Sequence, residues 1–221
     1  TAVMGSFRHS WITPLFTLFQ TGIKPNFYDL HFKATQLLNK NNKLMVNFYN
    51  GHDEVRQSAG NTDNLNKWGN TTGSLVWNRV IGGRSFINTS INMSRYENLG
   101  AYKYTLYDDD GDDDDVELES GSVGTFSSTE QYNIKSNAEI YMSNTLKLNV
   151  GVQLAHTIIK PFETKFSEEL EENESSFTSF TPLPFDELSA YGESEIKLSK
   201  RFFVRPGLHF SAYQFQKDRF Y

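Results

Sequence analysis

Cysteine is absent from this chain of 221 residues. Its absence excludes a disulfide framework, a zinc site with cysteine ligands and a catalytic thiol. No stretch approaches the roughly 18 consecutive apolar residues that a membrane-spanning helix requires, so a helical span is excluded. Basic residues are few and scattered, with 21 Lys and Arg against 27 Asp and Glu. We therefore expect no nucleic acid partner, because a phosphate-binding surface needs clustered Lys and Arg.

The remaining composition leaves both soluble and membrane classes open. The mean hydropathy is −0.53 and 38% of the residues are hydrophobic, values that also suit a transmembrane barrel, because half of each strand faces a polar lumen. The 18 Phe and 11 Tyr are typical of aromatic girdles at the two membrane interfaces. The first residues, Thr1-Ala2-Val3-Met4, do not resemble a signal peptide, so we expect a mature exported protein or part of a longer chain.

The clearest pattern is the alternation of apolar and polar residues between positions 124 and 160. One parity carries Tyr132, Ile134, Ala138, Ile140, Met142, Leu146, Leu148, Val150, Val152 and Leu154. The other parity carries Asn133, Lys135, Asn137, Glu139, Lys147, Asn149 and Gln153. This alternation places one face of a sheet in an apolar medium and the other in water. Strands beyond about 10 residues are rare in soluble sandwiches but usual in tilted strands that cross a bilayer, so we predict an outer-membrane β-barrel wall.

The chain divides into about nine predicted strands, at 5–12, 26–39, 43–56, 71–81, 85–106, 124–142, 146–160, 188–199 and 203–217. Short turns are predicted at 39–42, 82–84, 143–145 and 200–202, and long linkers at 13–25, 57–70, 107–123 and 161–187. Alternating short and long connections are typical of periplasmic turns and extracellular loops. The one helix candidate is a loop helix at 166–174. Pro206 lacks an amide hydrogen, so we expect it near a strand end or a bulge.

Together these patterns predict an all-β fold, an antiparallel transmembrane β-barrel segment with short periplasmic turns and long extracellular loops. The alternative is a half-buried sheet over a soluble core, but nine strands without a second apolar layer would have nothing to pack against. An odd number of strands with open edges cannot remain in hydrocarbon, because each unpaired backbone group there is costly. We therefore expect residues 1–221 to be part of one larger barrel domain.

Several short stretches carry a family resemblance. They are residues 24–33 (KPNFYDLHFK) and 42–53 (NKLMVNFYNGHD), Trp68-Gly69-Asn70, Trp77-Asn78, Ser94-Arg95-Tyr96 and Arg205-Pro206-Gly207-Leu208. Together, in this order, they resemble the middle of the barrel of TonB-dependent outer-membrane receptors, in the branch with a carboxypeptidase-regulatory-like domain. The resemblance runs from about residue 7 to residue 221.

The resemblance implies a barrel of about 22 strands with a plugged lumen, of which this chain supplies under half. The plug domain, the TonB-contacting segment and the closing strand are not recognised in this sequence, so no coupling residue is assigned. The implied function is import of a scarce or large nutrient across the outer membrane of a Gram-negative bacterium. The implied partners are membrane lipid, the rest of the barrel with its plug, the TonB complex and a surface lipoprotein. A passive porin and a soluble β-rich binding or adhesin module are the alternatives.

Candidate ligand-binding residues are the loop aromatics Trp68, Tyr102 and Tyr104. The histidines lie on separate predicted strands without the spacing of metal ligands; they are His9, His31, His52, His156 and His209. The sequence contains no nucleophile elbow, Walker loop or HExxH motif. We therefore expect neither an enzyme nor a cofactor.

The run at 108–115 (DDDGDDDD) offers the hard oxygen ligands that calcium prefers. Placing Gly111 at position 6 of an EF-hand loop puts Glu117 at position 12, but Leu106 then occupies position 1, where an acidic ligand belongs. We favour a solvated acidic loop tip, with weak divalent-cation binding by Asp108, Asp110, Asp112 and Asp114 as the alternative. The acidic stretch 163–174 has the same interpretation, and the apolar segment 177–185 is expected to pack against other parts of the barrel.

Overall fold

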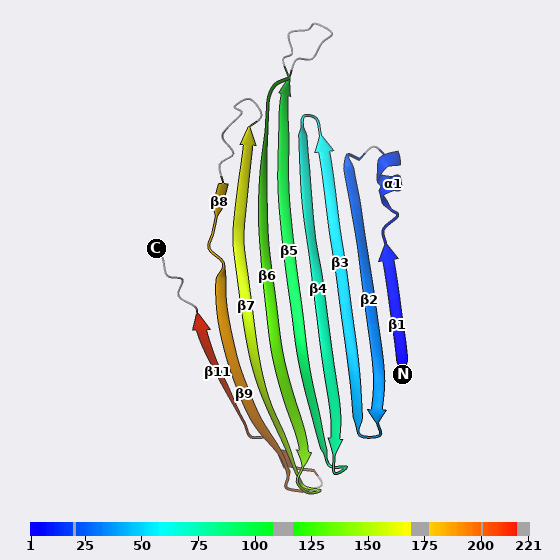
Figure 1. Ribbon diagram of the computed structural model, residues 1–221, viewed down its shortest axis with the longest axis vertical. Helices are drawn as coiled ribbons and strands as arrows, with labels where there is room; N and C mark the ends of the chain where they lie inside the picture. Colours follow the sequence, from blue (N-terminus) through cyan, green and yellow to red (C-terminus); the bar gives the residue numbers. More distant parts are fainter. Residues whose placement is uncertain (20, 108–116, 169–176, 200, 216–221) are drawn as a thin grey trace.

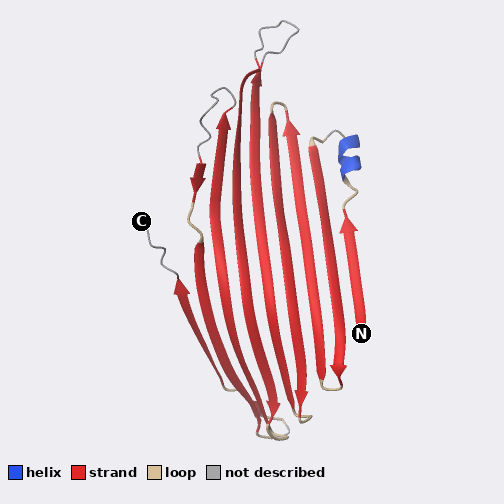
Figure 2. Ribbon diagram, viewed as in Figure 1, coloured by secondary structure: helices blue, strands red, loops and turns tan. Residues whose placement is uncertain are grey.

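The computed structural model describes residues 1–19, 21–107, 117–168, 177–199 and 201–215. Within these ranges nearly every residue lies in one antiparallel sheet (Figures 1 and 2). The strands are β1 (Ala2–His9), β2 (Ile23–Asn39), β3 (Asn42–Ala59), β4 (Thr62–Ile81), β5 (Ser85–Tyr107), β6 (Glu117–Tyr141), β7 (Leu146–Glu168), β8 (Phe177–Ser179), β9 (Leu183–Lys197), β10 (Phe203–Val204) and β11 (Gly207–Phe215). The predicted all-β antiparallel fold is confirmed.

Strands that follow one another in sequence lie side by side. The order across the sheet is β1-β2-β3-β4-β5-β6-β7-β9-β10, with β8 paired to β7 and β11 paired to β9. The connections β2–β3, β4–β5, β6–β7 and β9–β10 gather at the lower end of Figure 1, which we call the turn end, and the opposite end is the loop end. In the described residues β1 lies at one edge and β10 and β11 at the other, so the sheet is open.

The nine predicted strands correspond to the nine long strands, but the predicted linkers are too long. The linker expected at 57–70 is wrong, because β3 and β4 run through it and meet at a tight turn where Gly60 has φ 55°. The linkers predicted at 107–123 and 161–187 are also too long, because β6 begins at Glu117, β7 extends to Glu168 and β9 begins at Leu183. Side chains outside an apolar medium lose their alternation while backbone pairing continues, so the sequence underestimates these strands.

The helix expectation is also corrected. Residues 166–168, the start of the candidate loop helix, belong to β7, and 169–174 lie outside the described residues. A helix instead occurs in the predicted linker 13–25, where α1 (Thr13–Leu18) has Pro14 in its first turn, a position that needs no amide hydrogen. No helix in the described part of the chain has the length and apolar character needed to span a membrane. Pro206 falls between β10 and β11, as expected.

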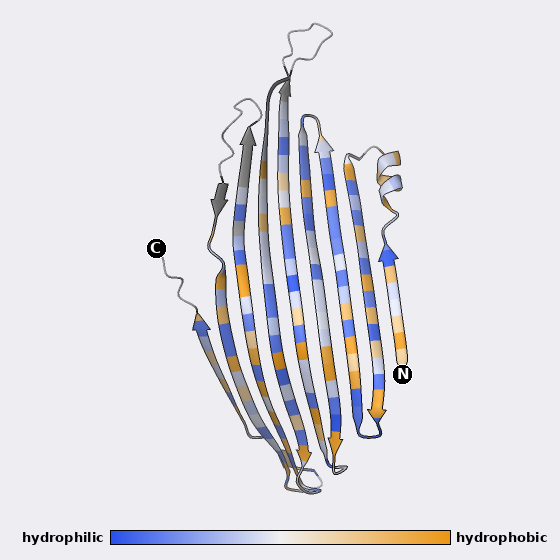
Figure 3. Ribbon diagram, viewed as in Figure 1, coloured by the Kyte–Doolittle hydropathy of each residue, from blue (hydrophilic) through white to orange (hydrophobic). Residues whose placement is uncertain are grey.

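Alternation gives the sheet two unlike faces, visible as blue and orange residues in turn along the strands (Figure 3). Residues directly opposite across paired strands share a face. One such row crosses nine strands through Val3, Ala34, Val46, Leu75, Ile91, Ile134, Leu154, Leu188 and Ala212. We call the face that carries this row the apolar face and the opposite one the polar face.

In the described part of the chain, no second sheet covers the apolar face. Ile91 is 53% exposed and Leu154 is 55% exposed, and among the described residues Ala155 is the only buried hydrophobic one. A soluble sheet would cover such side chains with a second sheet or helices. The described residues therefore supply no second layer for a soluble core beneath this sheet.

The apolar face has the height of a bilayer and is oblique to the strands. Leu146 and Leu154 mark its two borders on β7, about 26 Å apart along the strand, close to the roughly 25 Å apolar band of outer-membrane barrels. On β2 the band runs from Ala34 to Tyr28. The register aligns Ala34 with Leu154, the loop-end border on β7, so the border on β2 at Tyr28 lies six residues nearer the loop end.

A lysine on either face distinguishes a lipid-facing from a lumen-facing position. Ile91→Lys places a charge near the middle of the band and should lower the free energy of unfolding by about 2–4 kcal/mol. Asn92→Lys, on the polar face of the same strand, should change it by no more than about 0.5 kcal/mol. Urea unfolding of the protein in lipid vesicles measures both values. Equal effects at the two positions would contradict the assignment of the faces.

Candidate functional site

Across β3 to β6, one row of the polar face is a ladder of uncharged amide and hydroxyl side chains. Register aligns Asn47, Ser74, Asn92 and Asn133 across β3 to β6. The Asn47 amide donates to Ser74 Oγ at 3.0 Å, and the Asn92 amide donates to Asn133 Oδ1 at 2.7 Å. These side chains satisfy one another and leave remaining hydrogen-bonding capacity toward the lumen side. Such a wall suits water or a polar solute.

Two tyrosine rings on this face lie over glycines of the adjacent strand. The Tyr191 ring crosses Gly151, and its hydroxyl donates to Asn137 Oδ1 at 3.1 Å. A Cβ at Gly151 would meet both the Tyr191 ring and Asn137, and one at Gly121 would meet the Tyr104 ring. Glycine is needed here because the rings lie directly against the backbone. Sequence analysis missed these pairs, because each tyrosine and its glycine lie opposite one another on different strands.

The three predicted ligand-contacting aromatics all lie on the polar face, but in strands and not in loops. Trp68 belongs to β4, and Tyr102 and Tyr104 belong to β5. The rings of Tyr102 and Tyr104 have centroids 6.4 Å apart and are tilted by 33°. The prediction that Trp68 lies in a linker is therefore wrong. Its expected contact with a ligand stays a prediction.

Register fixes the spacing of this aromatic group. Trp68 lies opposite Asn98, and Asn98 is four residues from Tyr102, about 13 Å along the strand. Asn66 and Asn64 share the polar face of β4 with Trp68, and Asn64 lies opposite Tyr102. Aromatic rings offer flat apolar contact, and neighbouring amides offer donors and acceptors. We call Trp68, Tyr102 and Tyr104 with these amides the aromatic group.

Nearer the turn end, the polar face holds a hollow of about 670 Å³. Its lining is mixed: it includes four amides and two carboxylates together with Arg79, Phe86 and Tyr191, and the amides and carboxylates are Asn78, Asn88, Asn137, Glu139, Asn149 and Glu193. The Asn149 amide donates to Glu193 at 3.3 Å, and Lys147 pairs with Glu139 at 3.0 Å. A hollow of about 960 Å³ is lined by residues of β4, β5, β6, β7, β9 and β11, both from the apolar row, such as Ile91, and from the polar face, such as Asn92 and Asn133.

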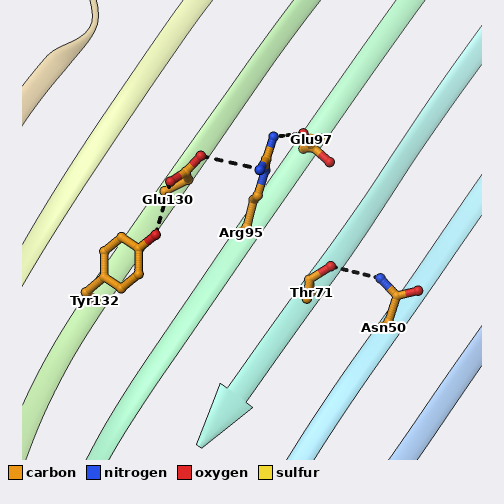
Figure 4. Close-up of polar contacts among 6 residues, drawn as sticks. All are labelled: Asn50, Thr71, Arg95, Glu97, Glu130 and Tyr132. Atoms are coloured by element: carbon orange, nitrogen blue, oxygen red, sulfur yellow. Dashed lines mark hydrogen bonds and ion pairs between the residues drawn. The ribbon is translucent and has the colours of Figure 1, made fainter.

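Polar contacts on the apolar face mark the loop-end border of the band (Figure 4). The Asn50 amide donates to Thr71 at 2.8 Å, and Arg95 pairs with Glu97 and, at 3.7 Å, with Glu130. The register aligns Asn50, Thr71, Arg95 and Glu130 in one row, four residues from the apolar row that contains Ile91. Charges at this height fit the membrane surface, where headgroups and water replace hydrocarbon.

No group of three or more metal-ligating side chains occurs in the described ranges. His156 pairs with Asp186 at 2.7 Å, and His52 stacks on Tyr28 with ring centroids 5.8 Å apart. The calcium candidates Asp108, Asp110, Asp112 and Asp114 lie outside the described residues.

The comparisons with known proteins agree with this geometry. The copper transporter OprC has a TM-score of 0.59 and 10% identity, over 85% of this chain and 28% of that one. The outer membrane transporter YddB from Escherichia coli has a TM-score of 0.62 and 7% identity, over 86% of this chain and 28% of that one. The fold is that of an outer-membrane barrel wall. The chain spans about 28% of the length of these transporters.

Sequence comparison adds nothing to this likeness. No protein-family model matches the chain. No curated protein matches it either. The outer-membrane assignment therefore rests on the sheet, its two faces and the solved transporters.

Beyond the band, a carboxylate on the apolar face has a perturbed pKa. Burial raises the pKa of the Glu54 carboxyl, but hydrogen bonds from Lys67 and Arg56 outweigh burial, and the pKa is lowered from its usual 4.5. Lys67 lies directly opposite Glu54 in the register, with 2.9 Å between Nζ and Oε2. Glu54 is four residues beyond Asn50, so the pair lies outside the membrane-spanning part.

The lowered pKa makes a pH-dependent contribution to stability. The ionised Glu54 stabilises the folded state at pH values above its unfolded pKa, and this contribution is lost as the pH falls through the lower folded pKa. Glu54→Gln should therefore lower the free energy of unfolding by about 1 kcal/mol at pH 7 and have little effect at pH 3. The double variant with Lys67→Met isolates the pair. An effect of Glu54→Gln that is the same at both pH values would contradict this assignment.

Proposed function

We propose that this chain forms part of the barrel of a TonB-dependent outer-membrane transporter that imports a scarce or large nutrient. The observation that carries the proposal is a single-layer antiparallel wall with an apolar, bilayer-high face and an amide-lined opposite face. Its likeness to two solved outer-membrane transporters over 85% and 86% of the chain supports the same function. The TonB dependence comes from the family resemblance of the short sequence stretches.

The proposal gives the wall an orientation. Short turns of outer-membrane barrels are periplasmic and longer loops are extracellular, so the turn end lies in the periplasm of a Gram-negative bacterium. The aromatic group then lies beyond the outer-leaflet border, because Trp68 is three positions before Thr71 of the border row. A nutrient arriving from outside would meet Trp68, Tyr102 and Tyr104 before it reaches the amide ladder. We propose no catalytic role for these residues.

The open edges specify the nearest partners. Backbone groups of β1 and β11 that face away from the sheet need hydrogen-bond partners in hydrocarbon, and further strands of the same barrel supply them in our proposal. A plug domain would contact the polar face, and TonB would act on it from the periplasm. A surface lipoprotein remains a candidate partner at the loop end.

Ion conductance separates a plugged transporter from a passive porin. The purified full-length protein, inserted into planar bilayers in KCl, should show no steady open channel, because the plug fills the lumen. Immobilised protein should also bind the purified periplasmic domain of TonB. A steady conductance without added TonB would favour the porin, and absence of TonB binding would contradict the energy-coupling part of the proposal.

Replacing the aromatic group tests the binding site. Trp68→Ala and Tyr102→Ala should each weaken the apparent affinity for uptake of the transported nutrient about two- to twelvefold, because a lost aromatic contact costs about 0.5–1.5 kcal/mol. The nutrient is identified beforehand by comparing uptake in strains with and without the protein. Leu99→Ala, on the apolar face of β5, is the matched control and should leave uptake unchanged. Wild-type affinity in both aromatic variants would remove the aromatic group from the path.

A further inference from the structure

The connection between β1 and β2 is uncharged and strongly apolar. Residues 10–23 (SWITPLFTLFQTGI) contain no Asp, Glu, Lys, Arg or His. They include α1, flanked by Trp11 and Phe19. The predicted loops at 108–115 and 163–174, by contrast, are acidic. This composition is unusual for a segment in contact with water alone.

The large side chains of this segment are open to the surroundings. Trp11 is 80% exposed, and Leu18 and Phe19 are each 73% exposed. Figure 1 shows α1 above the end of β1 and beside the upper part of β2. Ser10 donates its amide hydrogen to the Phe27 carbonyl at 2.7 Å, and the Thr13 hydroxyl donates to the Pro25 carbonyl. The segment is therefore fixed to the edge of the wall while its apolar side chains remain uncovered.

The oblique border of the apolar band places this segment at the membrane surface. On β2 the band reaches Tyr28, and His9 of β1 lies directly opposite Tyr28. Trp11 follows His9 by two residues, about 7 Å of extended chain. Phe7 and His9, whose rings stack 6.5 Å apart, continue the band to this point on β1. Trp and Tyr are the residues that favour the interface between hydrocarbon and headgroups.

We infer that residues 11–19 lie in the interface of the outer leaflet, with Trp11, Leu18 and Phe19 in contact with lipid. Lipid is the occupant that the structure favours, because the exposed surface is continuous with the lipid-facing band and carries no charge for a polar partner. The inference rests on the membrane placement in the proposed function.

The segment is too short to bind a membrane as an isolated helix, since α1 has six residues. Its attachment to β1 and β2 removes most of the entropic cost of locating it at the surface. Its role would then be to anchor this edge of the wall at a fixed depth. The same apolar side chains would be a liability on a loop that projects into water.

Nitroxide labels test the inference on the full-length protein in phosphatidylcholine vesicles. The 221 residues contain no cysteine, so within them Trp11→Cys places a label on the segment alone. Leu75→Cys on the apolar face and Ser74→Cys on the polar face are matched controls from one strand. Relaxation of the label by oxygen reports lipid, and relaxation by a water-soluble nickel chelate reports water.

The label at position 11 should behave like the one at 75, with most of the nickel relaxation seen at 74 lost and oxygen relaxation retained. Strong nickel relaxation at position 11 would overturn the inference, because the segment would then lie in water. Shielding from both reagents would also overturn it, because the segment would then pack against protein. A label at 75 that behaves like the label at 74 would instead refute the membrane placement, so the two failures are distinguishable.

Discussion

The structure depends on one constraint, that backbone amides and carbonyls in hydrocarbon must be paired within the protein. An unpaired group there costs several kcal/mol, and the continuous antiparallel ladder meets this demand from β1 to β9. Pairing in register also forces side chains opposite one another onto the same face. The apolar row through Ile91, Ile134 and Leu154 is thus a consequence of the ladder as much as of the sequence.

Backbone pairing also continues beyond the apolar band, so the strands are longer than the membrane is thick. β6 has 25 residues, about 80 Å of strand, whereas the apolar band takes about 26 Å on the neighbouring strand. The excess lies mainly toward the loop end, where side chains on the apolar face become charged, as at Arg95 and Glu130. The aromatic group lies in this projecting part on the polar face. A ligand contact there would be made by paired strands, which hold side chains more rigidly than loops do.

Particular elements show how far sequence reasoning reaches. Alternation located β5, β6 and β7 because their central residues meet lipid on one side and water on the other. It failed at 57–70, where Asn64, Asn66 and Trp68 face one side and polar residues also occupy the other, so no period-two signal remains. It also missed α1, whose apolar run has neither strand alternation nor enough length for a helical pattern. The expected ligand role of Trp68, Tyr102 and Tyr104 could not be derived from alternation, which identifies a face and not a function.

By itself the sequence determined the fold class, the number of long strands and which side chains share a face, because a period of two survives wherever the two sides of a strand meet different media. Only the tertiary structure decided the register between strands, and with it the oblique border of the apolar band. Register joins residues far apart in the chain, such as Tyr28, His52 and Gly69, and no local pattern encodes that alignment. The height of α1 relative to the membrane follows from the same alignment, since it is set by neighbouring strands and not by residues 10–23 themselves.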